Sequence, residues 1–133
     1  MTTEAVYEWI RTLAVAGAEN YYCGTLAAKK DKSIGVYQLK DRRAREVAIG
    51  GSKNTLTATK GISLLVHWTR STRDTENAAL ELYERITEAK DVSIGDFKVN
   101  YIQLLHNEPI DIGTDENGVC EHVIELVIYY ERR

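Results

Sequence analysis

The chain has 133 residues, a formal net charge of -3, and 44% hydrophobic and 28% charged residues. This length and composition are typical of one globular domain with its own core, so we expect residues 1–133 to fold as a single unit. No apolar run approaches the roughly 18 residues that a membrane-spanning helix needs, and the N-terminus has no signal-peptide pattern, so we expect folding in a cytoplasm without membrane contact.

The N-terminal segment predicts a helix over residues 3–15. Its apolar side chains recur at helical spacing, and Thr2 or Thr3 can cap its start. Gly17 is the residue type that most often ends a helix, so we expect the helix to stop just before it.

Two short strands are expected next, over residues 20–26 and 34–39. The polar stretch between them, residues 27–32, indicates a hairpin connection. The hydrophobic residues show neither helical nor strand periodicity over residues 40–60, which predicts a long flexible loop, with a brief strand allowed at 47–49.

Residues 60–69 predict a buried strand that leads directly into a helix. Its alternating pattern puts four apolar side chains on one packed face: Ile62, Leu64, Val66 and Trp68. Ser71 or Thr72 can cap the following helix, which we expect over residues 73–89. The apolar stripe of that helix consists of Ala79, Leu82, Tyr83 and Ile86.

The C-terminal part predicts two more strands, over residues 97–105 and 119–131. The first should place Phe97, Val99 and Tyr101 on one face. Between the strands, Pro109 interrupts ladder pairing and Asn117-Gly118 is a strong signal for a two-residue turn. The last strand has an apolar face made of Cys120, Ile124, Leu126 and Ile128, interrupted by His122.

This order of elements, α-β-β-β-α-β-β with one further short strand allowed, predicts an α+β fold. A mixed, mainly antiparallel sheet with both helices on one face accounts for the pattern. The second sheet face would carry Glu121 and Glu125 among Val123, Val127 and Tyr129, and would be left to solvent or to a partner.

The two cysteines, Cys23 and Cys120, are far apart in sequence and lie outside any CxxC pattern. In a reducing cytoplasm both should remain free thiols.

The charge is distributed unevenly along the chain. Residues 29–45 contain seven basic and two acidic residues, a net of +5, whereas residues 88–121 contain eight acidic and two basic residues, a net of -6. Solvated loops would explain this, but so would a head-to-tail contact between copies of the chain. The candidate subunit-interface residues are Arg42, Arg43, Arg45, Glu108, Asp111, Asp115 and Glu116.

No catalytic, metal or cofactor site emerges from the motifs. The three histidines form no metal-ligand spacing, the stretch Asp111–Gly118 lacks the central glycine of a calcium loop, and Gly50-Gly51-Ser52-Lys53 lacks most of a phosphate-binding loop. The basic run after Lys40 could contact phosphates, but the chain is acidic overall and the run contains no aromatic residue for base stacking.

Three stretches carry a resemblance to a known family. They are residues 34–40 followed by Arg42-Arg43, residues 60–68 leading into 75–79 and 82–84, and residues 106–113 with Gly118-Val119. Together they resemble the minor capsid and tail-terminator proteins of tailed bacteriophages, which act in head-tail joining.

The resemblance implies a tail-terminator-like fold, a ring of identical subunits, most plausibly a hexamer, and no enzyme activity or cofactor. It also implies a virion protein of a phage or prophage, assembled in the bacterial cytoplasm, with a tail tube protein and a head-completion protein as partners and DNA only as passing cargo. The resemblance leaves open whether the role is minor capsid protein or tail terminator. The alternative is a small prophage-derived or host adaptor domain without catalysis.

Overall fold

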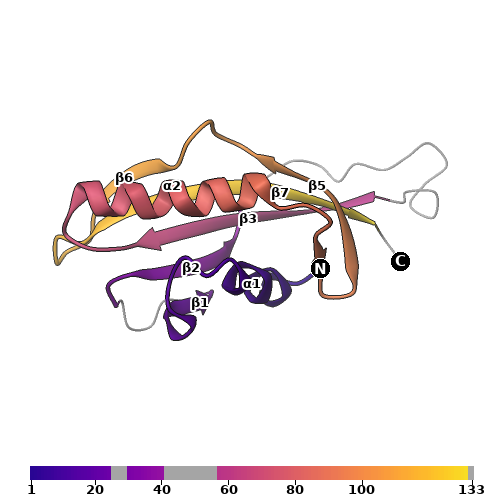
Figure 1. The fold of residues 1–133 in the computed structure, drawn as a ribbon, viewed down its shortest axis with the longest axis horizontal. Coiled ribbons are helices and arrows are strands. Elements are labelled where there is room, and N and C mark those ends of the chain that lie inside the picture. The colour runs from indigo at the N-terminus through magenta and orange to yellow at the C-terminus, as the bar shows by residue number, and fades with distance from the viewer. Residues whose placement is uncertain (25–29, 41–56, 132–133) are drawn as a thin grey trace.

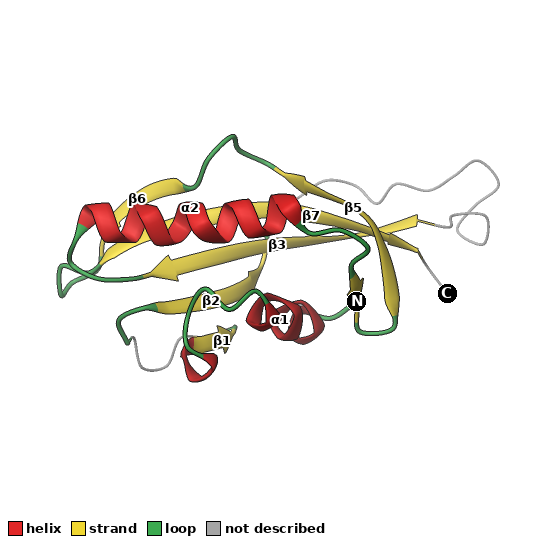
Figure 2. Ribbon diagram, in the orientation of Figure 1, coloured by secondary structure: helices red, strands yellow, loops and turns green. Residues whose placement is uncertain are grey.

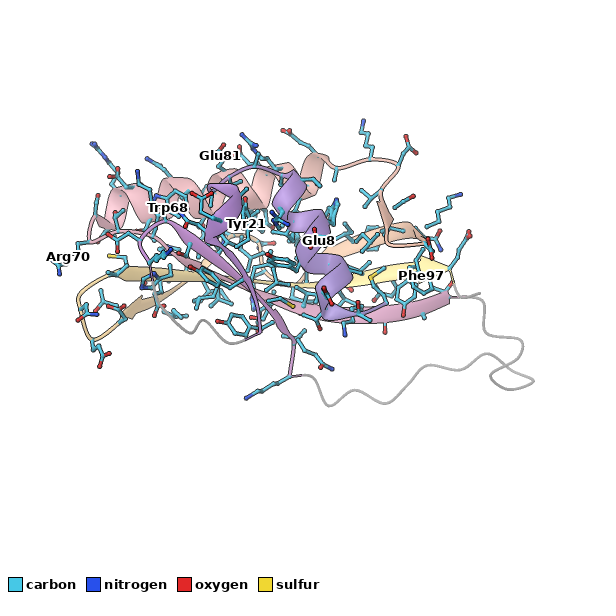
Figure 3. The ribbon with its side chains drawn as sticks, turned by 90° about the horizontal axis from the view of Figure 1, so that it is seen from below. Glu8, Tyr21, Trp68, Arg70, Glu81 and Phe97 are labelled. Carbon is cyan, nitrogen blue, oxygen red and sulfur yellow. The ribbon has the colours of Figure 1, made fainter. Side chains whose placement is uncertain are left out.

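The computed structural model describes residues 1–24, 30–40 and 57–131. Two helices, α1 (Thr3–Thr12) and α2 (Thr72–Glu88), lie on the same face of one curved sheet, as the two perpendicular views show (Figures 1 and 3). A short 3-10 turn, η1 (Ala18–Asn20), follows α1. The strands are β1 (Tyr21–Cys23), β2 (Ser33–Gln38), β3 (Thr57–His67), β4 (Ser93–Ile94), β5 (Phe97–Leu104), β6 (Ile110–Thr114) and β7 (Cys120–Glu131) (Figure 2).

The sheet is built around a long antiparallel ribbon of β3 and β7. The strand order is β1-β2-β3-β7-β5-β4, and β6 also pairs with β7. The ribbon runs from the pair Thr57–Glu131 at one end to the pair His67–Glu121 at the other. All strand pairs are antiparallel except β1 with β2, so the predicted α+β fold with a mixed, mainly antiparallel sheet and both helices on one face is confirmed.

The core lies between the ribbon and the helices, and its strand residues are those that alternation predicted. Fully or almost fully buried side chains form one cluster, which includes Val6, Ile10, Ile62, Leu64, Val66, Ala79, Leu82, Ile86, Ile124, Leu126 and Ile128. Trp68 departs from the prediction because β3 ends at His67, and the indole is only half-buried against the edge of this cluster.

The first helix was predicted over residues 3–15 with Gly17 as its stop signal; this end is wrong, because α1 already ends at Thr12. Ala14 has a left-handed backbone (φ 55°) and takes the role that a glycine usually fills. A guanidinium N–H of Arg85 on α2 donates to the carbonyl of Leu13, the residue that caps α1. This contact with a distant part of the chain satisfies a carbonyl that a longer helix would have bonded internally.

The predicted hairpin between the first two strands is also wrong, because β1 runs parallel to β2. The Tyr21 hydroxyl accepts hydrogen bonds from the backbone N–H groups of Val15 and Ala16, both at 2.9 Å. These bonds hold the chain after α1 in a tight path that sets the direction of β1. Local turn signals carry no information about such a contact.

The sequence missed β4 and β6 and misplaced one side chain of β5. A β-bulge between Val99 and Tyr101 shifts the register, so Tyr101 faces away from the core while Val99 and Ile102 both pack against it. The prediction that Tyr101 shares a face with Val99 is therefore wrong. The expected loop over residues 40–60 ends earlier, since β3 begins at Thr57; residues 41–56, including the expected strand at 47–49, lie outside the described residues.

Candidate functional site

The acidic candidates gather around β6 and the turn that joins it to β7. Glu108 precedes β6, Asp111 lies within it, and Glu116 lies in the turn; all three are exposed. The Asp111 carboxylate accepts a hydrogen bond from the N–H of Gly113 at 2.8 Å. Asp115 differs from the other three, because its side chain is only 5% exposed.

Asp115 is occupied inside the molecule rather than available to a neighbour. One carboxylate oxygen lies 2.8 Å from Nε2 of His67, and the other accepts from the backbone N–H groups of Asn117 (2.8 Å) and Val119 (3.0 Å). The hydrogen bond from His67, together with that from Val119, lowers the pKa of Asp115 from its usual 3.8 to about 2. Three of the four acidic candidates therefore remain as possible contacts, and Asp115 instead shapes the turn.

His67 completes a buried ion pair. Its Nδ1 lies 2.8 Å from the carbonyl oxygen of Lys30, which can only accept, so Nδ1 must donate. Its Nε2 lies 2.8 Å from a carboxylate oxygen of Asp115, so both ring nitrogens have hydrogen-bond partners within the chain. With 1% exposure and no free nitrogen, His67 cannot serve as a general base. The pair fastens the segment at Lys30, the end of β3 and the β6–β7 turn to one another.

The other two histidines, His106 and His122, form no hydrogen bond with the His67–Asp115 pair. His106 is exposed, with Nε2 3.0 Å from a carboxylate oxygen of Glu125, whereas His122 is buried on the core side. Within residues 1–24, 30–40 and 57–131, no three His, Cys, Asp or Glu side chains come together as metal ligands would. Neither α1 nor α2 has the length and apolar character required to cross a bilayer.

The basic candidates Arg42, Arg43 and Arg45 lie outside the described residues. The described residue that follows their segment, Thr57, pairs with Glu131 at the end of the ribbon opposite to His67 and the acidic turn. At about 3.3 Å per residue, the ten steps from Thr57 to His67 span roughly 33 Å. On the N-terminal side of this segment, the N–H of Leu39 donates to the carbonyl of Gly61, which pairs with Val127 nearer the middle of the ribbon.

The sheet face without helices is largely packed by its own side chains. Leu39 covers Gly61, where an added Cβ would lie 3.1 Å from the Leu39 Cβ, and the Tyr37 ring covers Gly35 in the same way. Val127, expected on this face as possible contact surface, is 0% exposed and cannot contribute. Tyr129 donates to the side-chain oxygen of Gln103 at 2.9 Å.

Exposed apolar surface occurs elsewhere. Among the described residues, the large exposed hydrophobic side chains are Tyr101 (60%) and Ile112 (52%). Each lies at a register shift, in β5 and β6 respectively. Sequence reasoning missed both positions, although Asp111-Ile112-Gly113 carries the Asp-x-Gly pattern of a local turn.

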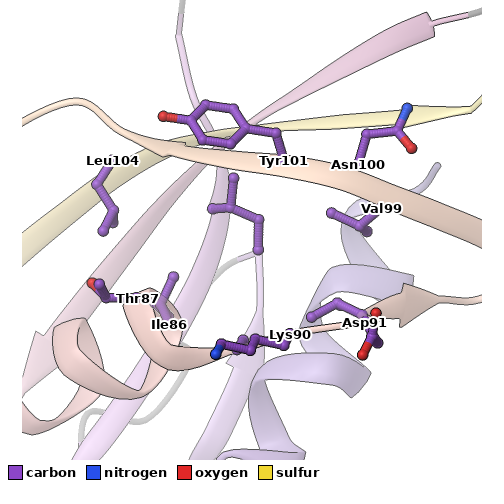
Figure 4. Close-up of a pocket in the computed structure, with 11 residues that line it drawn as sticks. Ile86, Thr87, Lys90, Asp91, Val99, Asn100, Tyr101 and Leu104 are labelled. Atoms are coloured by element: carbon purple, nitrogen blue, oxygen red, sulfur yellow. The ribbon is translucent and has the colours of Figure 1, made fainter.

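Two hollows formed by described residues lie beside the β3–β7 ribbon and its flanking elements. One, of about 480 Å³, lies at the ion-pair end and is lined by Asp31, His67, Arg70, Asp115, Asn117 and Val119. The other, of about 630 Å³, separates the end of α2 from β5. Figure 3 shows Arg70, which lines the first hollow, at one end of the long axis and Phe97, the first residue of β5, at the other. The second hollow runs along β5 from Val99 to Leu104 (Figure 4), which pairs with Leu126 near the middle of the ribbon.

Comparison with known proteins gives one family and one fold. Residues 3–132 match the family described as bacteriophage tail terminator protein. Among solved structures, a chain from the "Virion of native gene transfer agent (GTA) particle" has a TM-score of 0.58 at 14% identity, covering 98% of this chain and 94% of that one. No curated protein sequence matches. At that identity the structural likeness concerns the fold alone.

Proposed function

Because the chain belongs to the bacteriophage tail terminator protein family, we propose that it closes the head-proximal end of a phage or prophage tail as a ring of identical subunits. The observation that carries this proposal is the family match, which covers residues 3–132. The ring is most plausibly a hexamer. Its partners would be the tail tube protein on one side and a head-completion protein on the other.

The distribution of charge supports a head-to-tail ring. Closed rings of more than two subunits use two different patches on each subunit. Exposed Glu108 and Glu116 lie near the end of the ribbon that carries His67, whereas the sequence places its basic residues in a separate segment, 29–45. Exposed ion pairs give only about 0.2–1 kcal/mol each, so they would orient and register the contact rather than hold it.

We assign the working location as the virion, after assembly in the bacterial cytoplasm. The chain with the similar fold comes from a particle described as a gene transfer agent virion, which supports this placement. DNA would pass through the ring as cargo. A minor capsid role at the same junction, and a prophage-derived adaptor that remains monomeric, are the competing functions.

We propose no catalytic role. Both ring nitrogens of the buried histidine are engaged in hydrogen bonds within the chain, and the ring is shielded from solvent.

The decisive measurement is the mass of the purified protein, alone and after mixing with isolated tails that lack their terminator. A ring in either condition supports the tail terminator, and incorporation into finished tails separates it from a minor capsid protein. A chain that remains monomeric in both conditions and does not bind tails would favour the adaptor.

The charged contact is tested by reversing Arg42 and Arg43 to glutamate, which should weaken assembly most strongly at low salt. Reversing Glu108 and Glu116 to lysine in the same chain should restore part of it. Asp115 is unsuitable for this purpose because its loss would disturb the turn. The matched control, Glu76→Lys on the exposed side of α2, should assemble as the parent does.

A further inference from the structure

The turn between β6 and β7 carries a chemically reactive pair of residues. Asn117 is followed by Gly118, and no other asparagine of the chain has glycine after it. Because glycine has no side chain, its backbone nitrogen can approach the side-chain amide of the residue before it. Both residues are exposed, so water has access to them.

Such a pair can lose ammonia without an enzyme. The backbone nitrogen of Gly118 gives up its proton and bonds to Cγ of Asn117, the bond between Cγ and the side-chain nitrogen breaks, and that nitrogen leaves as ammonia. Water then opens the cyclic imide at either of its two carbonyls. Opening at one carbonyl gives aspartate, and opening at the other gives isoaspartate, in which the main chain runs through the former side chain.

The attacking nitrogen is held in place by the loop that it belongs to. The N–H of Gly118 donates to the carbonyl of Asp115 at 3.1 Å, and the N–H of Asp115 donates to the carbonyl of Val119 at 3.0 Å. Gly118 has a φ of +81°, the left-handed form that a hairpin loop of this kind requires at its last position. The proton that must leave for the reaction is therefore held in a hydrogen bond.

The peptide group between Asn117 and Gly118 is clamped at both ends. Its carbonyl accepts from Nε of Arg70 at 3.1 Å, and its N–H is the one that donates to Asp115. The N–H of Asn117 donates to the Asp115 carboxylate at 2.8 Å, and that carboxylate is itself bonded to the buried His67. The peptide group cannot rotate to bring its nitrogen onto Cγ without losing the bonds at both of its ends.

We propose that Asn117 is the site of spontaneous deamidation in this protein, and that the clamped peptide group keeps the reaction slow for as long as the β6–β7 turn is folded. Conversion to isoaspartate would lengthen the main chain by a methylene group just before Val119 and Cys120, which are buried. The N–H of Cys120 donates to the carbonyl of Thr69 at 2.8 Å, so this change would disturb the pairing that begins β7.

The first test compares the folded and the unfolded parent. Both are incubated in the same buffer, one of them in guanidinium chloride, and the peptide that contains Asn117 is followed by mass spectrometry for replacement of the amide by an acid. Loss of the amide should be at least about tenfold slower in the folded protein, because the reaction must wait for the turn to open. Equal rates in the two states would overturn the proposal.

The second test removes one end of the clamp. Arg70→Ala deletes the donor to the Asn117 carbonyl and leaves the His67–Asp115 pair intact, so the folded protein should deamidate roughly threefold to tenfold faster. Its rate in guanidinium chloride should equal that of the parent. Arg73→Ala, at an exposed position in the first turn of α2, is the matched control and should behave as the parent does.

The two results have separate meanings. Circular dichroism verifies that each variant remains folded during the incubation. If the folded parent is protected but Arg70→Ala deamidates at the parent's rate, the clamp is overturned as the cause of the protection. Neither comparison uses the oligomeric state, so the proposed ring and this inference stand or fall independently.

Discussion

At the scale of single residues, the most consequential finding is that Asp115 and His67 form a buried, fully satisfied ion pair. A carboxylate that seemed free to meet a neighbour's arginine instead accepts three hydrogen bonds from its own chain. A buried charge is tolerated when it is paired and hydrogen-bonded in this way. The result is a rigid β6–β7 turn that holds the exposed Glu116 in place.

This pair predicts a specific loss of stability in acid. The folded-state pKa of Asp115 is about 2, below its usual value of 3.8, so the stabilisation is fully present above about pH 4 and is lost as the pH falls toward 2. Asp115→Asn should be less stable than the parent at pH 5, and the difference should narrow below pH 4. Urea unfolding of both proteins from pH 2 to pH 6 measures the difference in their free energies of unfolding. Glu116→Gln is the control, and a gap that does not change with pH would contradict the assignment.

The thiols give a second residue-scale prediction. Cys23 is exposed and Cys120 is buried, and neither is bonded to the other. A thiol reagent should modify one cysteine in the folded protein and two after unfolding, and added reductant should leave the melting temperature unchanged. Partial burial and the nearby Glu4 raise the pKa of Cys23, so its reaction should be slow at neutral pH. Rapid modification of both thiols under native conditions would show that the last strand opens readily.

At the scale of elements, local signals determine where α2 begins, and distant contacts determine where α1 ends. Ser71, one of the two cap candidates that the sequence offered, caps α2 by accepting from the N–H of Asp74 at 3.2 Å. The end of α1 depends on Arg85, more than seventy residues away in the chain. The two bulges belong to the same category, since each becomes visible only against the partner strand β7.

Removing the α2 cap should have a modest effect. Ser71→Ala should lower the free energy of unfolding by about 1 kcal/mol, because the N–H of Asp74 loses its side-chain partner at the positive end of the helix. Ser71→Asp should retain most of the stability, since its carboxylate can accept the same bond. Chemical denaturation of the three proteins makes the comparison, and equal stability for Ser71→Ala would show that water replaces the cap.

Truncating the buried stripe of the same helix should have a larger effect. Leu82 is fully buried between α2 and the sheet, so Leu82→Ala should cost about 2–5 kcal/mol through lost apolar burial and the cavity left behind. Glu84→Ala, two residues away on the exposed side, should change stability by less than about 0.5 kcal/mol. Similar losses for both variants would contradict the orientation of α2.

At the scale of the whole molecule, the β3–β7 ribbon is the rigid axis that separates two chemically different ends. The helices pack on one of its faces, the His67–Asp115 pair closes one end, and the hollow between α2 and β5 extends from its middle toward the other.

This architecture predicts an uneven pattern of hydrogen exchange. The central residues of β3 and β7 pair on both sides and are covered by helices, so their amides should exchange slowest. The short strands β1 and β4 at the sheet edges should exchange faster. Exchange followed by mass spectrometry on the monomer provides the test. Protection that is uniform across the sheet, or highest in β1, would argue against the ribbon as the most stable unit.

The sequence alone determined the elements whose cause is local. Alternation identified the buried faces of β3 and β7, helical spacing identified the stripe on α2, and Ser71 marked its start. Together these were enough for the α+β class with both helices on one face. The three family-like stretches pointed to the tail terminator family, which the match over residues 3–132 bears out.

Only the tertiary structure decided the features that depend on contacts between distant residues. The Tyr21 hydroxyl bonds the chain that leads from α1 into β1, which runs parallel to β2, and Arg85 bonds the carbonyl at the end of α1. His67, forty-eight residues away, takes up the Asp115 carboxylate, which is therefore not available to a neighbouring subunit. The exposed positions of Tyr101 and Ile112 arise from register shifts against β7. Periodicity describes how side chains repeat along one strand, whereas a bulge is a mismatch between two strands, so these features became visible only in the folded chain.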